Sequence, residues 1–243
     1  MDVGAVHDRV RGSGLLAKDG VGGGRVLVMV SGGRDSVCLL DVAVVVRGPE
    51  SVKAMHVNYG LRGEASDGDE ALCVELCRRL GVELELVRVG VEERAEIAAG
   101  GNLQARARDL RYAAALRCAE ELGGAPVATG HTASDQVETI LYRLAASPGR
   151  RALLGMAPRE GPIVRPLLWL TREQTAGYCR ERNLVWREDA SNEDERFARA
   201  RVRHKLLPAL RAVHPAAESS VLRTAELLRE ESDLLDGLVQ AEL

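Results

Sequence analysis

The sequence predicts an α/β protein built on a doubly wound, mostly parallel sheet with a C-terminal helical extension. One observation is that apolar, β-prone segments at residues 25–30, 52–58 and 126–129 alternate with helical patterns. Another is that the segment 25–30 runs through Ser31-Gly32-Gly33 directly into a helix, which is the order found in parallel α/β units. Finally, 243 residues suffice for one such domain and an appendage.

Each expected element has a local reason. Helices are expected where apolar residues recur three and four positions apart between capping or turn residues; they are 35–46, 67–80, 102–122, one beginning at Ser134, 171–183 and 216–243. Short apolar or alternating runs predict strands or extended chain; they are 25–30, 52–58, 82–89 (at an edge), 126–129 and 163–170. The expected N-caps are Ser66 or Asp67, Asn102, Ser134 and Thr171.

The chain is expected to divide into three parts. Residues 1–24 hold a weak helical pattern at 3–16 and then a glycine-rich stretch, which predicts a flexible lead-in. Residues 25–210 form the main α/β domain. Residues 211–243 form a C-terminal helix.

The turn Ser31-Gly32-Gly33-Arg34-Asp35-Ser36 is the most informative stretch of the chain. Its glycines allow positive φ and the close approach of a ligand. The helix that follows offers unpaired N–H groups and the positive end of its dipole, so a phosphate site is predicted. Asp35 would repel a phosphate unless Mg²⁺ bridges the two groups, because hard cations take carboxylate and phosphate oxygens together. The turn lacks the terminal lysine of a Walker A loop.

Polar residues also gather after the second and fourth predicted strands, where open α/β sheets bind ligands. His56 lies near the carboxyl end of the second strand and Arg62 follows that strand, whereas His131 and Asp135 follow the fourth. A His–Asp pair can perform acid–base chemistry, and Asp135 can also bind Mg²⁺. The alternatives are a strand-end histidine with its hydrogen bonds satisfied, a solvated arginine and a helix cap.

The net charge of −3 argues against a generic nucleic-acid binder, but the charge is unevenly spread. Residues 143–211 hold 15 Arg and Lys against 8 Asp and Glu, which predicts one basic face. Because 196–211 contains no acid, its cations are expected to contact phosphates, with a solvated helix as the alternative. Arg108 and Arg111 share a helix face that suits phosphate or base contact as well as exposed salt bridges.

The composition excludes several classes of protein. No apolar run approaches the roughly 18 residues that a membrane span needs, and residues 1–24 lack the core of a signal peptide. The five cysteines are too few and too scattered for a disulfide framework. We therefore expect a cytoplasmic protein with reduced thiols and no membrane partner.

The loop is similar to the pyrophosphate loop (PP-loop) of the N-type ATP pyrophosphatases. With the other motifs, taken in order over residues 25–210, it resembles the tRNA(Ile)-lysidine synthases of that superfamily. These motifs are Ser31-Gly32-Gly33-x-Asp35-Ser36, His56-Val57-Asn58-x-Gly60-Leu61-Arg62, Ala107-Arg108-x-x-Arg111-Tyr112, Gly130-His131 with Asp135 and Glu138-Thr139, Arg165-Pro166-Leu167-Leu168 with Arg172-Glu173, Asp189-x-Ser191-Asn192, and Arg201-x-Arg203-His204.

The resemblance implies an adenine nucleotide alpha hydrolase-like fold and a carbon–nitrogen ligase. Such an enzyme uses ATP with Mg²⁺ to adenylate C2 of the wobble cytidine in a tRNA(Ile) with a CAU anticodon. The amine of free L-lysine then displaces AMP and forms lysidine. Many members carry further C-terminal tRNA-binding domains, so 211–243 is expected to be a linker to one or a remnant of one. Formation of a homodimer is another expected way to strengthen tRNA binding.

The resemblance also implies roles for individual residues. Those expected to bind ATP are Ser31, Gly32, Gly33, Arg34, Asp35, Ser36 and His56. Those expected to be catalytic are Asp35, Arg108, His131 and Asp135, with Asp35 and Asp135 holding Mg²⁺. Those expected to meet the tRNA or substrate are Arg62, Arg111, Glu138, Arg165, Arg199, Arg201, Arg203 and Lys205. The attacking lysine must be neutral, and its amine has a free pKa near 10.4; Asp135 and His131 are the candidates that take its proton.

The chain departs from the family pattern at Tyr59, Ser134, Ala200 and the segment 145–149, which bears on substrate positioning. Two other functions are consistent with the loop. One is a tRNA thiolase of the same superfamily, although Cys73-x-x-x-Cys77 is not the Cys-x-x-Cys pair that those enzymes use. The other is a non-catalytic module that binds nucleotide or RNA.

Overall fold

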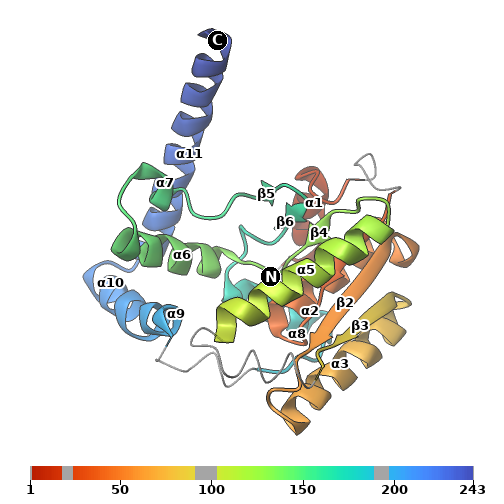
Figure 1. The fold of residues 1–243 in the computed structure, drawn as a ribbon. Coiled ribbons are helices and arrows are strands. Elements are labelled where there is room, and N and C mark those ends of the chain that lie inside the picture. The colour runs from red at the N-terminus through yellow and green to blue at the C-terminus, as the bar shows by residue number, and fades with distance from the viewer. Residues whose placement is uncertain (1, 18–23, 91–102, 189–196, 243) are drawn as a thin grey trace. The chain divides into compact units, whose positions relative to one another are not determined.

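The computed structural model describes residues 2–17, 24–90, 103–188 and 197–242 (Figure 1). The chain divides into two compact units. The first unit comprises Met1–Gly130, Pro158–Leu167 and Arg172–Glu188, and the second comprises His131–Ala157, Leu168–Thr171 and Asp189–Leu243. The expected Asn102 cap and the Asp189-x-Ser191-Asn192 motif lie outside the described residues.

The first unit contains a six-stranded sheet in the order β3-β2-β1-β4-β6-β5. Its strands are β1 (Val26–Met29), β2 (Val52–Asn58), β3 (Glu83–Arg88), β4 (Val127–Ala128), β5 (Arg159–Glu160) and β6 (Ile163–Val164). Neighbouring strands run parallel except β5 and β6, which are antiparallel. The predicted mostly parallel sheet is confirmed, with β3 at one edge. The extended stretch predicted at 163–170 is wrong beyond β6, because the chain turns there.

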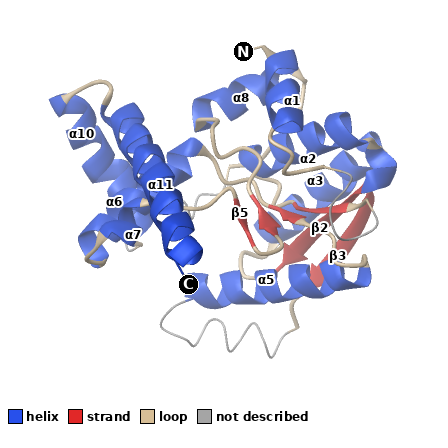
Figure 2. Ribbon diagram, turned by 90° about the horizontal axis from the view of Figure 1, so that it is seen from above, coloured by secondary structure: helices blue, strands red, loops and turns tan. Residues whose placement is uncertain are grey.

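Helices cover both faces of this sheet. They are α1 (Val3–Gly12), α2 (Arg34–Arg47), α3 (Glu64–Leu80), α5 (Leu103–Glu121) and α8 (Arg172–Glu181). A 3₁₀ turn, Pro49–Ser51, leads into β2. In Figure 2, α5 lies on one face and the other four helices lie toward the opposite face. Leu27 and Met29 pack with Ala115 and Cys118 of α5 in one buried cluster. Because side chains alternate along a strand, Val28 is buried on the other side.

The order of strands reverses between β1 and β4. The chain adds β2 and then β3 on one side of β1, and later adds β4 on the other side. In doubly wound sheets, ligands bind outside the carboxyl ends of the strands at this point of reversal. The loop Ser31–Ser36 follows β1 directly and therefore lies at this position.

The first residues of the chain form a packed helix. The weak helical pattern predicted at 3–16 becomes α1, whose Asp2 side chain caps the helix by accepting from the Ala5 N–H. Val6 and Val10 of α1 are buried. This part of the expected lead-in is therefore joined to the first unit by an apolar contact.

Two predicted N-caps are wrong. α3 begins at Glu64 with Gly63 as its N-cap, so Ser66 lies within the first turn, where its Oγ accepts from the Arg62 N–H at 3.2 Å. The helix predicted to begin at Ser134 is capped by Thr132. In both cases the helix begins before the residue that the sequence predicted as its N-cap.

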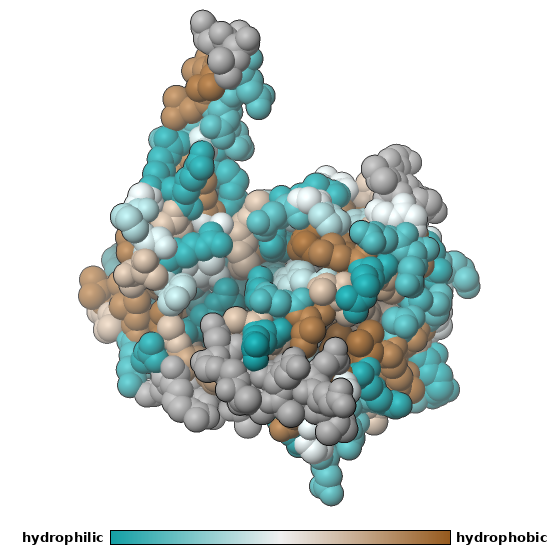
Figure 3. Space-filling model, viewed as in Figure 1, coloured by the Kyte–Doolittle hydropathy of each residue, from teal (hydrophilic) through white to brown (hydrophobic). Residues whose placement is uncertain are grey.

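The second unit is helical. Its elements are α6 (Ala133–Ala146), α7 (Arg150–Leu153), α9 (Ala198–Arg201), a π-helical segment (Val202–Leu206), α10 (Leu207–Val213) and α11 (Ala217–Glu242). Val137 and Leu141 of α6 form a small core with Val202 and Leu207. The predicted C-terminal helix is confirmed as α11, and apolar side chains on it are exposed (Figure 3); these are Leu227, Leu234, Leu235, Leu238 and Val239.

Across the described ranges, none of the helices is both long enough and apolar enough to span a bilayer.

Candidate functional site

The loop after β1 is shaped to receive an anion. Gly32 has a φ of 81°, a left-handed conformation that favours glycine. Gly33 is the N-cap of α2, and no described side chain caps the helix at this position. The first N–H groups of a helix have no carbonyl one turn earlier, and they carry the positive end of the helix dipole. The loop therefore presents donors where the sequence predicts a phosphate site.

The two serines of the loop close it on itself. The Ser36 hydroxyl donates to the Gly33 carbonyl at 2.8 Å and accepts from the Ser31 N–H at 3.1 Å. The Ser31 and Ser36 hydroxyl oxygens lie 3.2 Å apart. Ser36 is buried, whereas Ser31 is exposed. Ser36 thus shapes the loop, and Ser31 is the serine that a ligand can reach.

The loop is also supported from two other segments. Gly130, after β4, lies so close to α2 that an added Cβ would be 3.0 Å from Asp35 C, Asp35 O and Ser36 N. On another side, the Arg187 N–H donates to the Gly32 carbonyl at 3.0 Å. The chain that follows α8 therefore fixes one peptide of the loop.

Asp35 is held by polar groups of two helices. The Thr175 hydroxyl of α8 donates to its Oδ1 at 2.5 Å. The Arg34 Nε lies 3.2 Å from the same oxygen, and the Arg172 Nε lies 3.9 Å from Oδ2. The Asp35 side chain remains 20% exposed, so a ligand can reach the carboxylate.

His56 is tied to the end of β1. Its Nδ1 lies 2.9 Å from the Val30 carbonyl and 3.4 Å from the Cys73 sulfur. Because a carbonyl only accepts, Nδ1 carries the proton. The Nε2 atom is buried and has no hydrogen-bond partner among the described residues. The bond from Nδ1 to Val30 fits the alternative that the sequence left open, a strand-end histidine with its hydrogen bond satisfied. The predicted contact of His56 with ATP stays a prediction.

Arg62 has a carboxylate partner. Its Nη2 donates to Asp69 Oδ2 at 2.6 Å, and the Nε of Arg187 donates to Asp69 Oδ1 at 2.7 Å. Asp69 is buried, and it holds two cations beside α3. Asp69 therefore holds the Arg62 guanidinium, and Arg62 is not the isolated solvated arginine that the sequence left as an alternative.

The residues around Tyr59 order the loop after β2. The Tyr59 hydroxyl donates to the Ala107 carbonyl of α5 at 2.6 Å, and burial raises the pKa of Tyr59 while Arg111 acts in the opposite direction. Asn58 donates to Glu70 at 2.9 Å. Hydrogen bonds from Arg88 and then Asn58 lower the pKa of Glu70 to about 2.

The two arginines of α5 have different surroundings. The Arg108 guanidinium lies 4.9 Å from the centre of the Tyr112 ring, a cation–π contact one helical turn along. The Arg111 Nε is buried and has no hydrogen-bond partner among the described residues. Farther along the chain, Arg165 is buried and donates to Glu160 at 2.9 Å.

In the second unit, Asp135 is the N3 residue of a capping box at the start of α6. Its Oδ2 accepts from the Thr132 N–H at 2.9 Å and from the Thr132 hydroxyl at 2.7 Å. The Asp135 N–H in turn lies 3.4 Å from the Thr132 hydroxyl. The capping role that the sequence offered for Ser134 thus belongs to Thr132 and Asp135. His131 immediately precedes this cap and is partly buried.

Side chains of α6 partly compensate the positive charge of the basic segment, the described part of residues 196–211. Arg203 forms two hydrogen bonds to the buried Glu138 of α6, at 2.7 and 3.1 Å, and Arg199 donates to the Thr139 hydroxyl at 3.2 Å. The segment contains no acid of its own, but Glu138 of α6 supplies one to Arg203, and the predicted phosphate contacts stay a prediction. Arg201 and Lys205 are exposed.

Asp35 fits a Mg²⁺ ion that arrives with a nucleotide. Among the described residues, no group of three or more His, Cys, Asp and Glu gathers in a way that could hold a metal. Mg²⁺ is usually bound by one or two carboxylates together with substrate phosphates rather than by an all-protein cage. A reachable carboxylate at the edge of an anion-binding loop meets that requirement.

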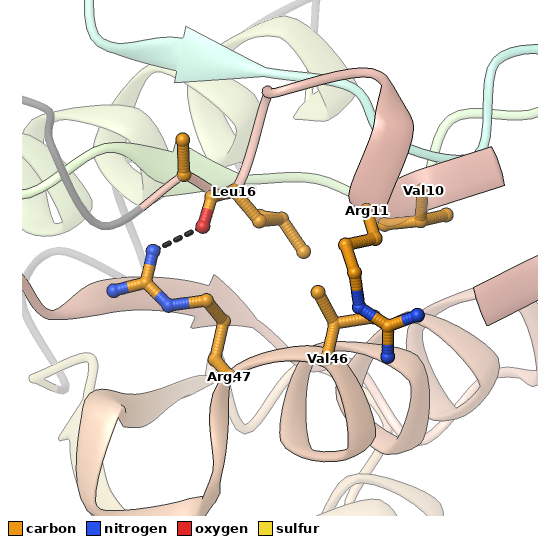
Figure 4. A pocket seen from close by; sticks show the side chains of 6 residues that line it. Val10, Arg11, Leu16, Val46 and Arg47 are labelled. Carbon is orange, nitrogen blue, oxygen red and sulfur yellow. Dashed lines mark hydrogen bonds between the residues drawn. The ribbon is translucent and has the colours of Figure 1, made fainter. Parts of the chain in front are cut away.

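A separate cavity of about 220 Å³ lies at the other end of α2 (Figure 4). Val10, Leu16, Val46 and Arg47 line it, and Arg47 donates to the Leu16 carbonyl. Arg47 is twelve residues after Asp35 on the same helix, which is about 18 Å along its axis. The cavity is therefore not part of the loop Ser31–Ser36, which is called the phosphate loop below after its predicted ligand.

Sequence reasoning missed Thr175, Asp69 and Arg187. Thr175 and Arg187 lie more than 100 residues from the groups they contact, so no local pattern indicates them. Asp69 belongs to the acidic stretch after the second strand, and its i,i+7 spacing from Arg62 is a weak signal. Thr132 was missed because Ser134 also suits an N-cap.

Comparisons with known proteins agree with this geometry. A family model described as the PP-loop domain matches residues 9–210. The tRNA(Ile)-lysidine synthase of Dehalococcoides mccartyi is 39% identical over 240 residues, which cover 93% of this chain and 50% of the relative. The enzyme of the same name from Thermus thermophilus is 40% identical over 243 residues, which cover 100% of this chain and 45% of the relative. The chain thus spans about half the length of the curated relatives it matches.

A solved structure shows the same fold. It is the U34-tRNA thiolase NcsA from Methanococcus maripaludis with its 4Fe-4S cluster, with a TM-score of 0.70 and 18% sequence identity, covering 93% of this chain and 80% of that one. At this identity the likeness concerns the fold alone. The loop Ser31–Ser36 at the reversal of the sheet agrees with the family match. The match over residues 9–210 shows that the chain belongs to the PP-loop domain family.

Proposed function

We propose that this chain uses ATP to join L-lysine to C2 of the wobble cytidine of a tRNA(Ile) with a CAU anticodon. The reaction passes through an adenylated cytidine and releases pyrophosphate and then AMP. The observation that carries the proposal is the match to tRNA(Ile)-lysidine synthases at 39% and 40% identity over nearly all of this chain. The loop geometry supports it, because it offers an anion site beside a reachable carboxylate.

The first step requires departure of pyrophosphate. In the proposal, the N–H groups at the start of α2 and the Ser31 hydroxyl hold the departing phosphates, whose negative charge increases as the bond breaks. When bound, Mg²⁺ on Asp35 supplies further stabilisation of that charge. Ser36 maintains the shape of the loop through its bonds to Gly33 and Ser31.

The second step requires a neutral amine. Lysine has a free pKa near 10.4, so almost all of it is protonated at neutral pH. Asp135 and His131 are proposed to take that proton. Asp135 Oδ2 accepts two hydrogen bonds from Thr132, which hold the carboxylate at the start of α6. Asp135 is also proposed to contact Mg²⁺.

The substrate contacts belong to the same proposal. Arg201 and Lys205 are exposed on the basic segment and are proposed to contact tRNA phosphates. Arg108 is proposed to be catalytic. Five further arginines and one glutamate are proposed to lie in the tRNA or substrate path; these are Arg62, Arg111, Glu138, Arg165, Arg199 and Arg203. A cytoplasmic location and a homodimer complete the proposal.

The test is direct. The purified chain is incubated with a tRNA(Ile) transcript, ATP, Mg²⁺ and L-lysine, and the digested nucleosides are analysed by mass spectrometry. Lysidine in place of one cytidine, with AMP formed only when tRNA is present, is the expected result. Asp35→Asn is expected to abolish the product while the tRNA still binds.

Other products would point to other functions. A sulfur-for-oxygen exchange would identify a thiolase, and ATP binding with no change in any nucleoside would identify a binding module. The cysteines favour neither a thiolase nor a bound cluster: all five are buried thiols, and the described residues contain no group of three metal-ligand side chains.

A further inference from the structure

α8 reaches Asp35 from a remote part of the chain. The Thr175 hydroxyl lies 2.5 Å from Asp35 Oδ1 although 140 residues separate the two in sequence. Thr175 is fully buried, whereas 20% of the Asp35 side chain is exposed. The hydroxyl therefore holds one carboxylate oxygen from inside the protein and leaves the carboxylate open to a ligand.

The single proton of Thr175 has two acceptors within reach. They are Asp35 Oδ1 at 2.5 Å and the Arg172 carbonyl at 3.0 Å. Hydrogen bonds to an ionised carboxylate are shorter and about twice as strong as those to a neutral carbonyl. The proton therefore goes to Asp35, and the bond restricts a side chain that otherwise samples about three staggered rotamers.

We propose that Thr175 is a positioning residue of the nucleotide site, which holds Asp35 in the rotamer that presents its Oδ2 to the Mg²⁺ accompanying ATP. This inference rests on the proposed use of ATP. It assigns to α8 a part in metal–nucleotide binding that the phosphate loop alone does not reveal. Arg172, 3.9 Å from Oδ2, balances the charge of that oxygen when the metal is not there.

The same two helices supply a matched control. Tyr178, one turn after Thr175, donates its hydroxyl proton to Asp41 Oδ2 at 2.6 Å. Asp41 lies six residues after Asp35 on α2, about 9 Å along the helix. Tyr178 and Asp41 are both buried. Each pair is thus a hydroxyl–carboxylate bond between α8 and α2, but only the Thr175 pair lies at the phosphate loop.

The experiment compares Thr175→Val, Thr175→Ser and Tyr178→Phe with the unchanged chain. Binding of a fluorescent ATP analogue is titrated with Mg²⁺ and repeated in EDTA, and circular dichroism monitors the fold. Thr175→Val is expected to raise the Mg²⁺ concentration at half-saturation about 3-fold, as an aspartate free among about three rotamers would require. Binding in EDTA is expected to change little. Thr175→Ser, which keeps the hydroxyl, is expected to restore the value, and Tyr178→Phe to leave it unchanged.

Three results would overturn the inference. An unchanged Mg²⁺ requirement in Thr175→Val would show that the hydroxyl does not position the carboxylate. An equal rise in Tyr178→Phe would show a general packing effect between the helices, and nucleotide binding that ignores Mg²⁺ in the unchanged chain would remove the role altogether. The readout is independent of lysine transfer, so a Thr175 effect without lysidine formation would reject the proposed function while supporting this inference.

Discussion

Arg203 lies against Glu138 in a two-pronged ion pair inside the second unit. Its Nε is 2.7 Å from Oε1 and its Nη2 is 3.1 Å from Oε2. The Glu138 side chain is only 1% exposed, and that of Arg203 is 28% exposed. Planar, paired contacts of this kind suit a guanidinium far better than an ammonium. Arg203 therefore serves first as the partner of a buried carboxylate.

Replacing Arg203 by alanine is expected to destabilise the protein by about 3–5 kcal/mol, because the buried Glu138 carboxylate would lose its two hydrogen bonds from the guanidinium. Urea unfolding followed by circular dichroism measures this loss. The double variant Arg203→Ala with Glu138→Gln is expected to recover part of it, since a neutral amide costs less to bury than a carboxylate. A loss below about 1 kcal/mol in the single variant would mean that the pair behaves like a surface salt bridge.

The proposed tRNA contact is better tested at Arg201 and Lys205. Reversing both charges with Arg201→Glu and Lys205→Glu is expected to weaken tRNA binding and leave ATP binding intact. Removing two phosphate contacts is expected to reduce the slope of log affinity against log salt by about 2. Filter binding at several salt concentrations gives both quantities.

The matched control for that charge reversal is the pair Arg78→Glu and Arg79→Glu on α3. These residues are exposed, and their reversal changes the net charge by the same amount. An equal loss of tRNA affinity in the control would show that total charge, and not the basic segment, governs binding.

Gly130 is expected to tolerate no side chain. A Cβ there would lie 3.0 Å from backbone atoms of Asp35 and Ser36, and backbone at the start of a helix cannot yield as a flexible side chain can. Gly130→Ala is therefore expected to displace the first turn of α2 and to weaken ATP binding roughly tenfold or more, as a shift of about 1.4 kcal/mol would produce. Isothermal titration calorimetry measures the affinity.

Gly237→Ala provides the comparison for Gly130→Ala. Apart from neighbouring residues of its own helix, nothing lies within 4 Å of its added Cβ, and alanine is favoured over glycine in a helix by up to about 1 kcal/mol. This variant is expected to bind ATP normally and to melt at the same temperature or higher. Normal ATP binding by Gly130→Ala would argue that the loop adapts without loss.

The contact of α1 with α8 is expected to depend on pH. His7 Nε2 lies 2.7 Å from the Tyr178 hydroxyl, whose own proton goes to Asp41, so Nε2 must carry a proton and donate. Burial lowers the pKa of His7 below 6.5; Asp41 opposes this shift, and Arg182 and then Arg11 add to it. The other nearby charge, Asp8, also opposes it.

A folded-state pKa below the unfolded value means that the unfolded chain binds more protons. The contribution of neutral His7 to stability is therefore full above about pH 6.5 and is lost as the pH falls through the lowered folded value. Urea unfolding at pH 7.5 and pH 5.5 is expected to show a smaller pH effect in His7→Gln than in the unchanged chain. An identical pH effect in both proteins would exclude His7 as the source.

Local patterns predicted the parts of this protein that short-range physics controls. Apolar strands followed by glycine, and helices with apolar residues at spacings of three and four, were sufficient to predict the mostly parallel sheet and the loop Ser31–Ser36 after β1. Gly32 adopts the positive φ that such a turn requires. The N-caps failed where two capping residues stood close together, as with Thr132 and Ser134.

Only the tertiary structure decided which groups surround the predicted site residues. Asp35 accepts a hydrogen bond from Thr175, and Arg203 pairs with Glu138, which lies 65 residues earlier in the sequence. A helix pattern shows which face is apolar, but not which remote polar group will meet a given side chain. Those partners depend on how helices pack around the sheet and around each other, because a buried charge is stable only beside a compensating group that the whole fold brings to it.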